Sequence, residues 1–545
     1  MIYRSTLAGY FRSRDRGWIL SLVTVVCMLY LPFLGSPFVF DDLTFFFGGV
    51  AGEYAHSWFH FDLRWLPYAT LGWTEMLFSN VVTHFFRLGN LLIHAANVIL
   101  LFYLLRQLTS AVIGRNENAS AVIWGAWLGA LIFALHPVAV YATGYVVQRS
   151  ILMATFFALV TQLAYLRGLL SGKSGWLALA VASYFLAVFS KEHSVMTLAL
   201  LATETVLLRD RLQVARPVLG WAWAGFAGVA LLIILIAKGV FGTPYEAMAA
   251  ALFEQQGVVG SGLTLHLLSV LTQAGLFFKY LLLWLLPNPA WMSVDMRVPF
   301  ISSLSSWQGW LGAAGFLAYG YASLRLLLRG GVRGLIGLAL LYPWLQFWLE
   351  FSSIRVQEPF VLYRSYLWMP GLLLLIPLLL LRWPGRRTVF VLGLAALLLV
   401  PLAVNRLWVF ADSYRLWNDA VRLLPDERVP GADRIFFNRG QAAAGRGKLA
   451  EAIADFQKAA ELSPQYAPVR FELGWTYAIT GRYQDAMVEF DAAIANDAKY
   501  ASAYYGKAML LKMRHEDKQA AEYMEKSCEL KYAMACLIVK GHAEH

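Results

Sequence analysis

The chain has 545 residues, of which 59% are hydrophobic and only 14% are charged. Soluble domains are about 45–50% apolar and about 25% charged, so a soluble globular protein is excluded. Its 20 Trp, 26 Tyr and 35 Phe exclude a disordered chain. Three Cys are too few for a disulfide scaffold of this length, and the 43 Gly follow no collagen-like period. A polytopic membrane protein remains.

Apolar stretches long enough to cross about 30 Å of hydrocarbon recur from residue 18 to residue 408. Large residues, Pro32 and Phe33, follow the first stretch where a signal-peptide cleavage site needs small ones, so we expect this helix to remain as an anchor. We predict about eleven or twelve transmembrane helices, near residues 18–35, 86–108, 120–140, 151–167, 176–190, 193–208, 218–238, 263–286, 307–328, 335–351, 361–381 and 388–408.

The net charge is +11, and the Lys and Arg of the membrane half lie in short hydrophilic breaks between apolar stretches. This distribution is typical of the loops of a membrane protein rather than of a nucleic-acid-binding surface. Cytoplasmic loops are rich in Lys and Arg. We therefore place the N-terminus in the cytoplasm and the C-terminal tail outside, which needs an odd number of crossings. One of the twelve stretches must then fail to cross, and 263–286 is the candidate because outer segments flank it on both sides. The outer segments are 36–85, 136–150, 191–193, 239–262, 287–306 and 350–364.

After Arg434 the charged residues become roughly twice as dense, and a 34-residue repeat begins. It aligns Gly440 with Gly474 and Ala508, and Phe456 with Phe490, which is the tetratricopeptide (TPR) pattern. We predict a membrane domain over 1–410 with an outer loop at 36–85, a connecting segment over 411–433, and about three TPR repeats over 434–545.

The repeats are expected to bind a protein partner through the first helix of each repeat. The residues predicted for this face are Glu472, Tyr477 and Tyr504, with Arg439, Gln441 and Lys507 around them. Cys528 and Cys536 lie in the third repeat without a neighbouring His cluster, so two unpaired structural thiols are favoured over a metal site.

Two adjacent carboxylates, Asp41 and Asp42, follow the first predicted helix, and Arg64 lies further along the same outer loop. Repulsion between adjacent acids raises one pKa, which makes that carboxylate a candidate base; alternatively the pair holds a divalent cation, or merely caps an interfacial helix.

Further polar residues gather at the other outer segments. Several cations converging on one membrane face suit an anionic group such as a lipid phosphate. Snorkelling explains any single Lys or Arg, but it does not explain why these cations accompany carboxylates and histidines, although Asn90 and His94 also fit a satisfied intramembrane pair. The residues are His84, Asn90, His94, His136, Gln148, Arg149, Lys191, Glu192, Arg364 and Tyr366.

Sequence motifs for nucleotide binding and hydrolysis are absent: the chain has no P-loop, no Gly-x-Ser-x-Gly, no His-Glu-x-x-His and no Cys-x-x-Cys. An activated substrate would therefore arrive in another form, most simply as a lipid-linked donor.

In chain order, several short motifs resemble the transmembrane-and-TPR O-mannosyltransferases of the C-type glycosyltransferase (GT-C) superfamily. They are Phe38–Leu43 (FVFDDL), Arg64–Pro67 (RWLP), Asn90–Ala95 (NLLIHA), Ala134–Val138 (ALHPV), Arg149, Ser190–Glu192 (SKE) and Arg364–Pro370 (RSYLWMP). The resemblance implies a GT-C-like membrane enzyme that uses a polyprenyl-phosphate sugar, with an active site on the outer face and the acidic pair central to catalysis. Family acids appear here as Tyr141, Ile151 and Tyr363, so the sugar and acceptor are expected to differ from the family's.

The mechanism predicted on this basis makes Asp41 the base for an acceptor hydroxyl, while Asp42 positions the acceptor or a cation. Arg64, Arg149, Lys191 and Arg364 would stabilise the leaving lipid phosphate, and His136 would hydrogen-bond to the phosphate or sugar.

The predicted acceptor is Ser or Thr of an exported protein such as a pilin, recruited by the TPR tail at a bacterial inner membrane. Two alternatives stay open: a non-catalytic flippase of lipid-linked sugars, and a glycan polymerase or ligase with the same chemistry.

Overall fold

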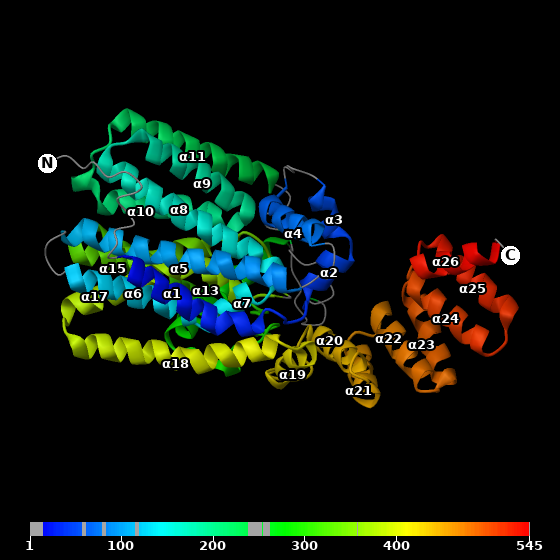
Figure 1. Ribbon diagram of the computed structural model, residues 1–545. Helices are drawn as coiled ribbons and strands as arrows, with labels where there is room; N and C mark the ends of the chain where they lie inside the picture. The colour runs from blue at the N-terminus through cyan, green and yellow to red at the C-terminus, as the bar shows by residue number, and fades with distance from the viewer. Residues whose placement is uncertain are drawn as a thin grey trace. The chain divides into compact units, whose positions relative to one another are not determined.

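The computed structural model describes residues 15–56, 62–78, 83–114, 119–237, 243, 253, 262–356 and 358–543. The elements in these ranges are α-helices and short 3-10 helices, so the predicted all-α fold is confirmed (Figure 1). The chain divides into two compact units. Unit 1 is Met1–Val294 with Val298–Asp412, and unit 2 is Asp295–Arg297 with Ser413–His545.

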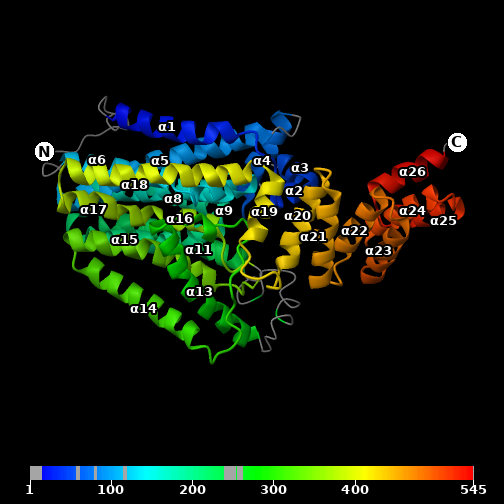
Figure 2. The same cartoon turned by 90° about the horizontal axis from the view of Figure 1, so that it is seen from below.

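Unit 1 is a bundle of long helices with short helices at one end, where α2, α4 and α7 lie (Figures 1 and 2). The helices of the bundle are α1 (Arg16–Tyr30), α5 (Thr83–Ile113), α6 (Ala119–Leu135), α8 (Arg149–Ser171), α9 (Ser174–Ser190), α10 (Thr197–Leu207), α11 (Arg216–Ile236), α13 (Gly262–Leu285), α14 (Trp307–Leu328), α15 (Gly331–Phe347), α17 (Leu375–Arg382) and α18 (Arg386–Phe410). Its short elements include α2 (Asp41–Phe47), α3 (Val50–Ala55), α4 (Trp65–Leu77), α7 (Ala139–Thr143), α16 (Ser365–Trp368) and the 3-10 helices η3 (Val146–Gln148), η4 (Glu192–Met196), η7 (Trp348–Phe351) and η8 (Leu362–Arg364).

Within the described ranges, eight helices are long and apolar enough to cross a membrane, and a ninth results if the bent pair Leu362–Trp368 and Pro370–Arg382 is one span. The remaining predicted spans correspond to shorter helices. Helices α6 and α9 have 17 residues each, and α10 has 11. The sequence therefore located the apolar segments correctly but did not show that some of them form short helices.

The outer helices of the bundle expose apolar surface. In the most apolar 18-residue stretch of α11, and likewise of α18, only 17% is buried inside the protein. In the corresponding stretch of Val146–Ser171, which includes α8, 83% is buried. Large side chains such as Trp221, Leu311 and Phe390 are 80%, 62% and 70% exposed. Exposed apolar faces of this extent need hydrocarbon around them, so unit 1 is an integral membrane unit.

Helix α13 is one continuous helix of 24 residues. It runs parallel to α14, because Leu271, Gly275 and Phe278 lie against Gly309, Gly312 and Gly315 in that order. Near its start, His266 is hydrogen-bonded to the carbonyl oxygen of Phe351 in η7. Seven residues after its end, the Met292 carbonyl oxygen accepts a hydrogen bond from Tyr141 in α7, and α7 packs on η8. Helix α13 is itself one of the eight helices of the described ranges that are long and apolar enough to cross a membrane, so the statement that 263–286 does not cross stays a prediction.

Unit 2 is built of antiparallel helix pairs, as expected for TPR repeats. A Cβ added at Gly440 would lie 2.7 Å from the Phe456 ring, and one at Gly474 would lie 3.0 Å from the Phe490 ring, so these glycines allow the paired helices to approach closely. The pairs are α20 (Ala432–Ala444) with α21 (Leu449–Leu462), α22 (Ala467–Ile479) with α23 (Tyr483–Asn496), and α24 (Ala501–Met513) with α25 (Asp517–Glu529), preceded by α19 (Ser413–Arg422) and followed by α26 (Ala533–Ala543).

Two features of unit 2 differ from the predictions. Helix α19, which falls in the predicted connecting segment, packs into unit 2 through buried Leu416 and Trp417. Cys528 and Cys536 form a disulfide between α25 and α26, so the prediction of unpaired thiols is wrong. The pairing was not predicted from the sequence, because only the turn between the two helices brings the two side chains together.

The disulfide predicts a simple pattern of thiol reactivity. Denaturation without reductant, followed by alkylation, should modify one cysteine per chain, Cys27, because it is the free thiol of the described part. Reduction before alkylation should raise the number to three. Mass spectrometry of the peptides distinguishes the two states, and three alkylated cysteines without reductant would contradict the disulfide.

Candidate active site at one end of the helix bundle

The side chain of Asp42 anchors the start of α2 inside unit 1. It is fully buried and accepts hydrogen bonds from the backbone N–H groups of Val39 (3.2 Å), Val146 (3.3 Å) and Val147 (2.8 Å). Burial raises the pKa of Asp42 to about 7, although Arg87 and the three N–H donors favour its ionised form. Its oxygens thus tie the outer loop to the turn before α8.

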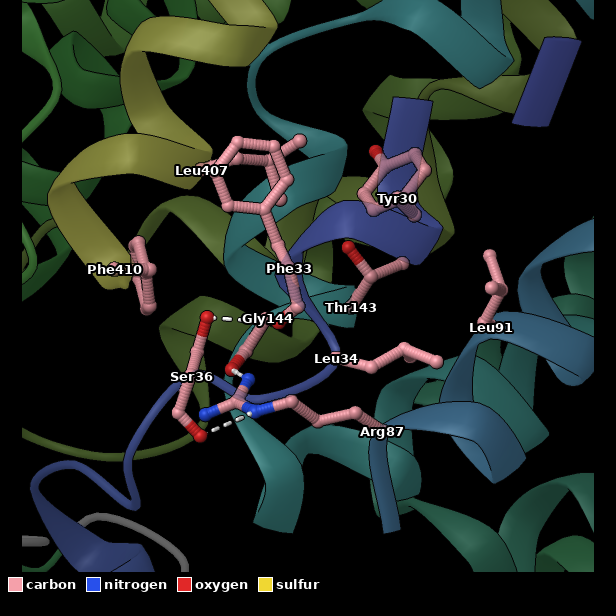
Figure 3. A pocket seen from close by; sticks show the side chains of 10 residues that line it. All are labelled: Tyr30, Phe33, Leu34, Ser36, Arg87, Leu91, Thr143, Gly144, Leu407 and Phe410. Atoms are coloured by element: carbon pink, nitrogen blue, oxygen red, sulfur yellow. Dashed lines mark hydrogen bonds between the residues drawn. The ribbon is translucent and has the colours of Figure 1, made fainter. Parts of the chain in front are cut away.

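Arg87 lies next to this anchor, in a cavity of about 20 Å³ between α1, α5, α7 and α18 (Figure 3). Its guanidinium donates to the carbonyl oxygens of Ser36 (3.1 Å), Pro37 (2.5 Å) and Gly144. A cavity of this size holds about one water molecule, so it is no substrate site. Arg87 fixes the chain between α1 and α2 and balances the charge of Asp42, a role that the sequence analysis did not predict.

Asp41, in contrast, has an exposed side chain. Its backbone N–H donates to the hydroxyl of Tyr145 (2.9 Å). The preceding residue, Phe40, has a φ of 55°, a left-handed conformation that non-glycine residues rarely adopt. Strained residues of this kind occur preferentially at functional sites. Burial, and then the negative charge of Asp41, raise the pKa of Tyr145 well above its usual value.

Aromatic rings connect this region to Lys191. The Tyr145 ring lies 6.1 Å from the Tyr363 ring, and the Lys191 ammonium lies 5.0 Å from the centroid of Tyr363. Lys191 is buried and donates to Gln148 (3.2 Å) and Ser150 (3.4 Å). Burial, and then the nearby positive charge of Arg64, lower the pKa of Lys191 well below its usual range.

An ion-pair network surrounds Lys191. Arg64, in α4's N-terminal cap, donates two hydrogen bonds to Glu192, at 2.7 and 3.1 Å. Burial opposes ionisation of Glu192, but Arg64 and His193 outweigh it and hold the pKa of Glu192 well below its usual range. The adjacent His193 bonds to Glu350 through Nε2 at 2.8 Å.

Glu350 extends the network to two more arginines. Its Oε2 lies 2.9 Å from Arg364 and 3.0 Å from Arg355, and all three side chains are buried. The network, defined as Arg64, Glu192, His193, Glu350, Arg355 and Arg364, joins the N-terminal cap of α4, η4, η7, η8 and the segment between η7 and η8. The three arginines of the network outnumber its two carboxylates, which suits an anionic ligand.

Arg149 and Asn90 face the scaffold instead. The guanidinium of Arg149 donates to the Asn90 side chain (2.9 Å) and to the carbonyl oxygens of Phe86 (2.8 Å) and Thr70 (3.2 Å). These bonds join α4, α5 and α8. Arg149 therefore holds these three helices together.

The remaining predicted residues form a separate polar layer in the bundle or lie at its edge. His94 bonds to the Tyr366 hydroxyl at 2.7 Å, which also accepts from Asn97 at 3.2 Å. His136 is buried and stacks on Trp284 at 4.1 Å. His84 is exposed at the start of α5.

We searched the described residues for side chains that could coordinate a metal ion. Within the described ranges no group of three or more His, Cys, Asp or Glu is arranged to bind one. In addition, both oxygens of Asp42 already accept backbone hydrogen bonds.

Comparisons with known proteins identify the tail. Residues 443–525 match the tetratricopeptide repeat family model, which confirms the predicted repeats. A search of curated proteins finds no match. Similar solved structures include MamA (20% identity, 29% of this chain and 85% of MamA, TM-score 0.20). YrrB, described as a TPR protein with an unusual peptide-binding site, is 19% identical over 30% of this chain and 87% of its own, with a TM-score of 0.22.

A third solved structure is similar over much of the chain. It is the archaeal oligosaccharyltransferase AglB from Archaeoglobus fulgidus, in complex with an inhibitory peptide and a dolichol-phosphate. The identity is 15%, the TM-score is 0.36, and the match covers 76% of this chain and 59% of AglB.

The anchoring position of Asp42 predicts a loss of stability on substitution. Asp42→Ala leaves three backbone N–H groups without their acceptor, which should cost about 1–3 kcal/mol for each donor that stays unsatisfied. The melting temperature of the purified protein in detergent should fall clearly. Asp41→Ala is the matched control, since its side chain is exposed, and it should change the melting temperature little. Equal effects of the two substitutions would contradict the anchor.

Proposed function

We propose that this chain is an integral-membrane glycosyltransferase that moves a sugar from a polyprenyl-phosphate donor to a hydroxyl group, on Ser or Thr of an exported protein such as a pilin. The observation that carries the proposal is the cation-rich network around Glu350, next to Lys191 and connected through Tyr363 and Tyr145 to Asp41. It lies at one end of an apolar bundle, where a lipid-linked phosphate would be presented.

In this proposal, Asp41 accepts the proton of the acceptor hydroxyl, and the resulting nucleophilic oxygen attacks the anomeric carbon of the sugar. The bond from that carbon to the phosphate oxygen breaks, and the lipid phosphate leaves with the electron pair. Arg64, Arg355 and Arg364 stabilise the charge that develops on the phosphate. Glu192 and Glu350 hold these arginines in place, because each carboxylate bonds to at least one of them.

The roles differ from the sequence-based assignment at a few positions. Arg355 and Glu350 join the donor site, and Asp42 and Arg149 become positioning residues, since their polar atoms bond to the scaffold. The layer of His94 and Tyr366 supports the site from inside the bundle.

We place the N-terminus in the cytoplasm and the active site and the TPR repeats on the outer, periplasmic side. The basic loops support this orientation. The disulfide in unit 2 suits an oxidising compartment, so the alkylation experiment also bears on the orientation.

The proposal predicts the effect of removing the base. Asp41→Asn keeps the shape of the side chain but removes the proton acceptor, so transfer should fall by about 10²–10⁴-fold. The assay uses protein purified in detergent, a lipid-linked sugar and a peptide with Ser and Thr, and mass spectrometry of the peptide.

The control in this assay is donor binding, which Asp41→Asn should leave nearly unchanged. Transfer in detergent, without any membrane to cross, cannot come from a flippase. Full activity of Asp41→Asn would contradict the assignment of the base, and absence of transfer by the wild type with varied donors would favour the flippase.

A further inference from the structure

Unit 2 carries a continuous line of partly exposed aromatic side chains, which we call the aromatic ladder. It consists of Phe471 and Trp475 in α22, Tyr505 in α24 and Tyr532 just before α26. Successive ring centroids are 6.1, 6.3 and 5.0 Å apart. The ladder therefore crosses from the second repeat to the end of the third.

Most cations in the first helix of each repeat are paired with carboxylates of unit 2. Helices α20, α22 and α24 carry five Lys and Arg residues, and four of them bond to carboxylates of unit 2. The pairs are Arg434–Asp295 (2.9 Å), Arg439–Asp455 (2.6 Å), Arg470–Glu489 (3.0 Å) and Lys507–Asp491 (2.5 Å). The fifth, Lys512, lies in the last turn of α24.

One residue predicted for the binding face is buried, and the other two are hydrogen-bonded within unit 2. Tyr477 is 4% exposed and accepts a hydrogen bond from Gln457 (2.8 Å), so its assignment to the face is wrong. Tyr504 is partly buried and donates to the Ala498 carbonyl oxygen (3.1 Å). The third predicted residue, Glu472, is hydrogen-bonded to Gln441 (3.0 Å), and burial raises its pKa.

We propose that the aromatic ladder binds an extended, uncharged segment with apolar and aromatic side chains. Aromatic rings supply a large contact area at a small cost in side-chain entropy, and the ladder is long enough to contact several residues of an extended chain. An acidic segment would find the paired cations already neutralised. A basic segment would meet apolar rings and one carboxylate, Glu472, which already accepts a hydrogen bond from Gln441. That this segment belongs to the glycosylated acceptor rests on the proposed function; the binding itself does not.

The experiment uses the full-length protein in detergent and three fluorescent peptides of equal length. The first contains Phe and Leu among Ala, Ser and Thr, the second has Asp in place of Phe and Leu, and the third has Lys there. Fluorescence anisotropy should show binding of the first peptide and at least tenfold weaker binding of the other two.

Substitutions locate the binding surface. Trp475→Ala and Tyr505→Ala should each weaken binding of the apolar peptide at least tenfold, and Tyr532→Ala, at the end of the ladder, provides a third variant should either of them unfold. Tyr483→Ala is the matched control, because Tyr483 lies in α23 and is 41% exposed; it should leave binding unchanged.

Tighter binding of a charged peptide, or unchanged binding by folded ladder variants, would overturn the proposal. The outcome is separate from that of the transfer assay. Binding without sugar transfer would contradict the proposed function alone, and transfer to a short peptide without ladder binding would contradict the aromatic ladder alone.

Discussion

The structure of the candidate site depends on one buried carboxylate, that of Glu350. Moving an unpaired charge out of water costs several kcal/mol, and Glu350 is 1% exposed. It meets this cost by bonding to Arg355, Arg364 and His193. Conversely, Glu350 supplies the negative charge that pairs with both buried arginines. Removing Glu350 would leave the buried cations of Arg355 and Arg364 close together without a counter-charge. The two arginines therefore depend on Glu350.

The same interaction joins segments that are distant in the sequence. His193 connects Glu350 to Glu192, which in turn binds Arg64 of the outer loop. The loop before α4, the turn before η4 and the segment around η7 are thereby held at one end of the bundle. Two further contacts hold the same loop: Asp42 accepts a hydrogen bond from Val147 in η3, and Arg149 in α8 donates to the Thr70 carbonyl oxygen in α4. A donor phosphate bound among the arginines would thus influence the position of the loop that carries Asp41.

The sequence predicted those features that a local pattern encodes. Apolar stretches located the helices of unit 1, and the 34-residue period located the repeats, because small residues such as Gly440 recur where helices touch. It did not single out Glu350, Arg355 or Arg87, because none of them belongs to a recognisable sequence motif, and only the fold brings each to its partner. Tyr477 was misplaced for a related reason: the repeat period does not show which side of a helix faces its pair.

Affinity for the phosphate group tests the central claim most directly. The account predicts that the full-length protein binds a polyprenyl phosphate at least tenfold more tightly than the corresponding polyprenyl alcohol in detergent. Arg355→Gln and Arg364→Gln should reduce this preference, whereas Arg386→Gln, an exposed position at the start of α18, should leave it unchanged. Equal affinity for the phosphate and the alcohol in the wild type would contradict the account.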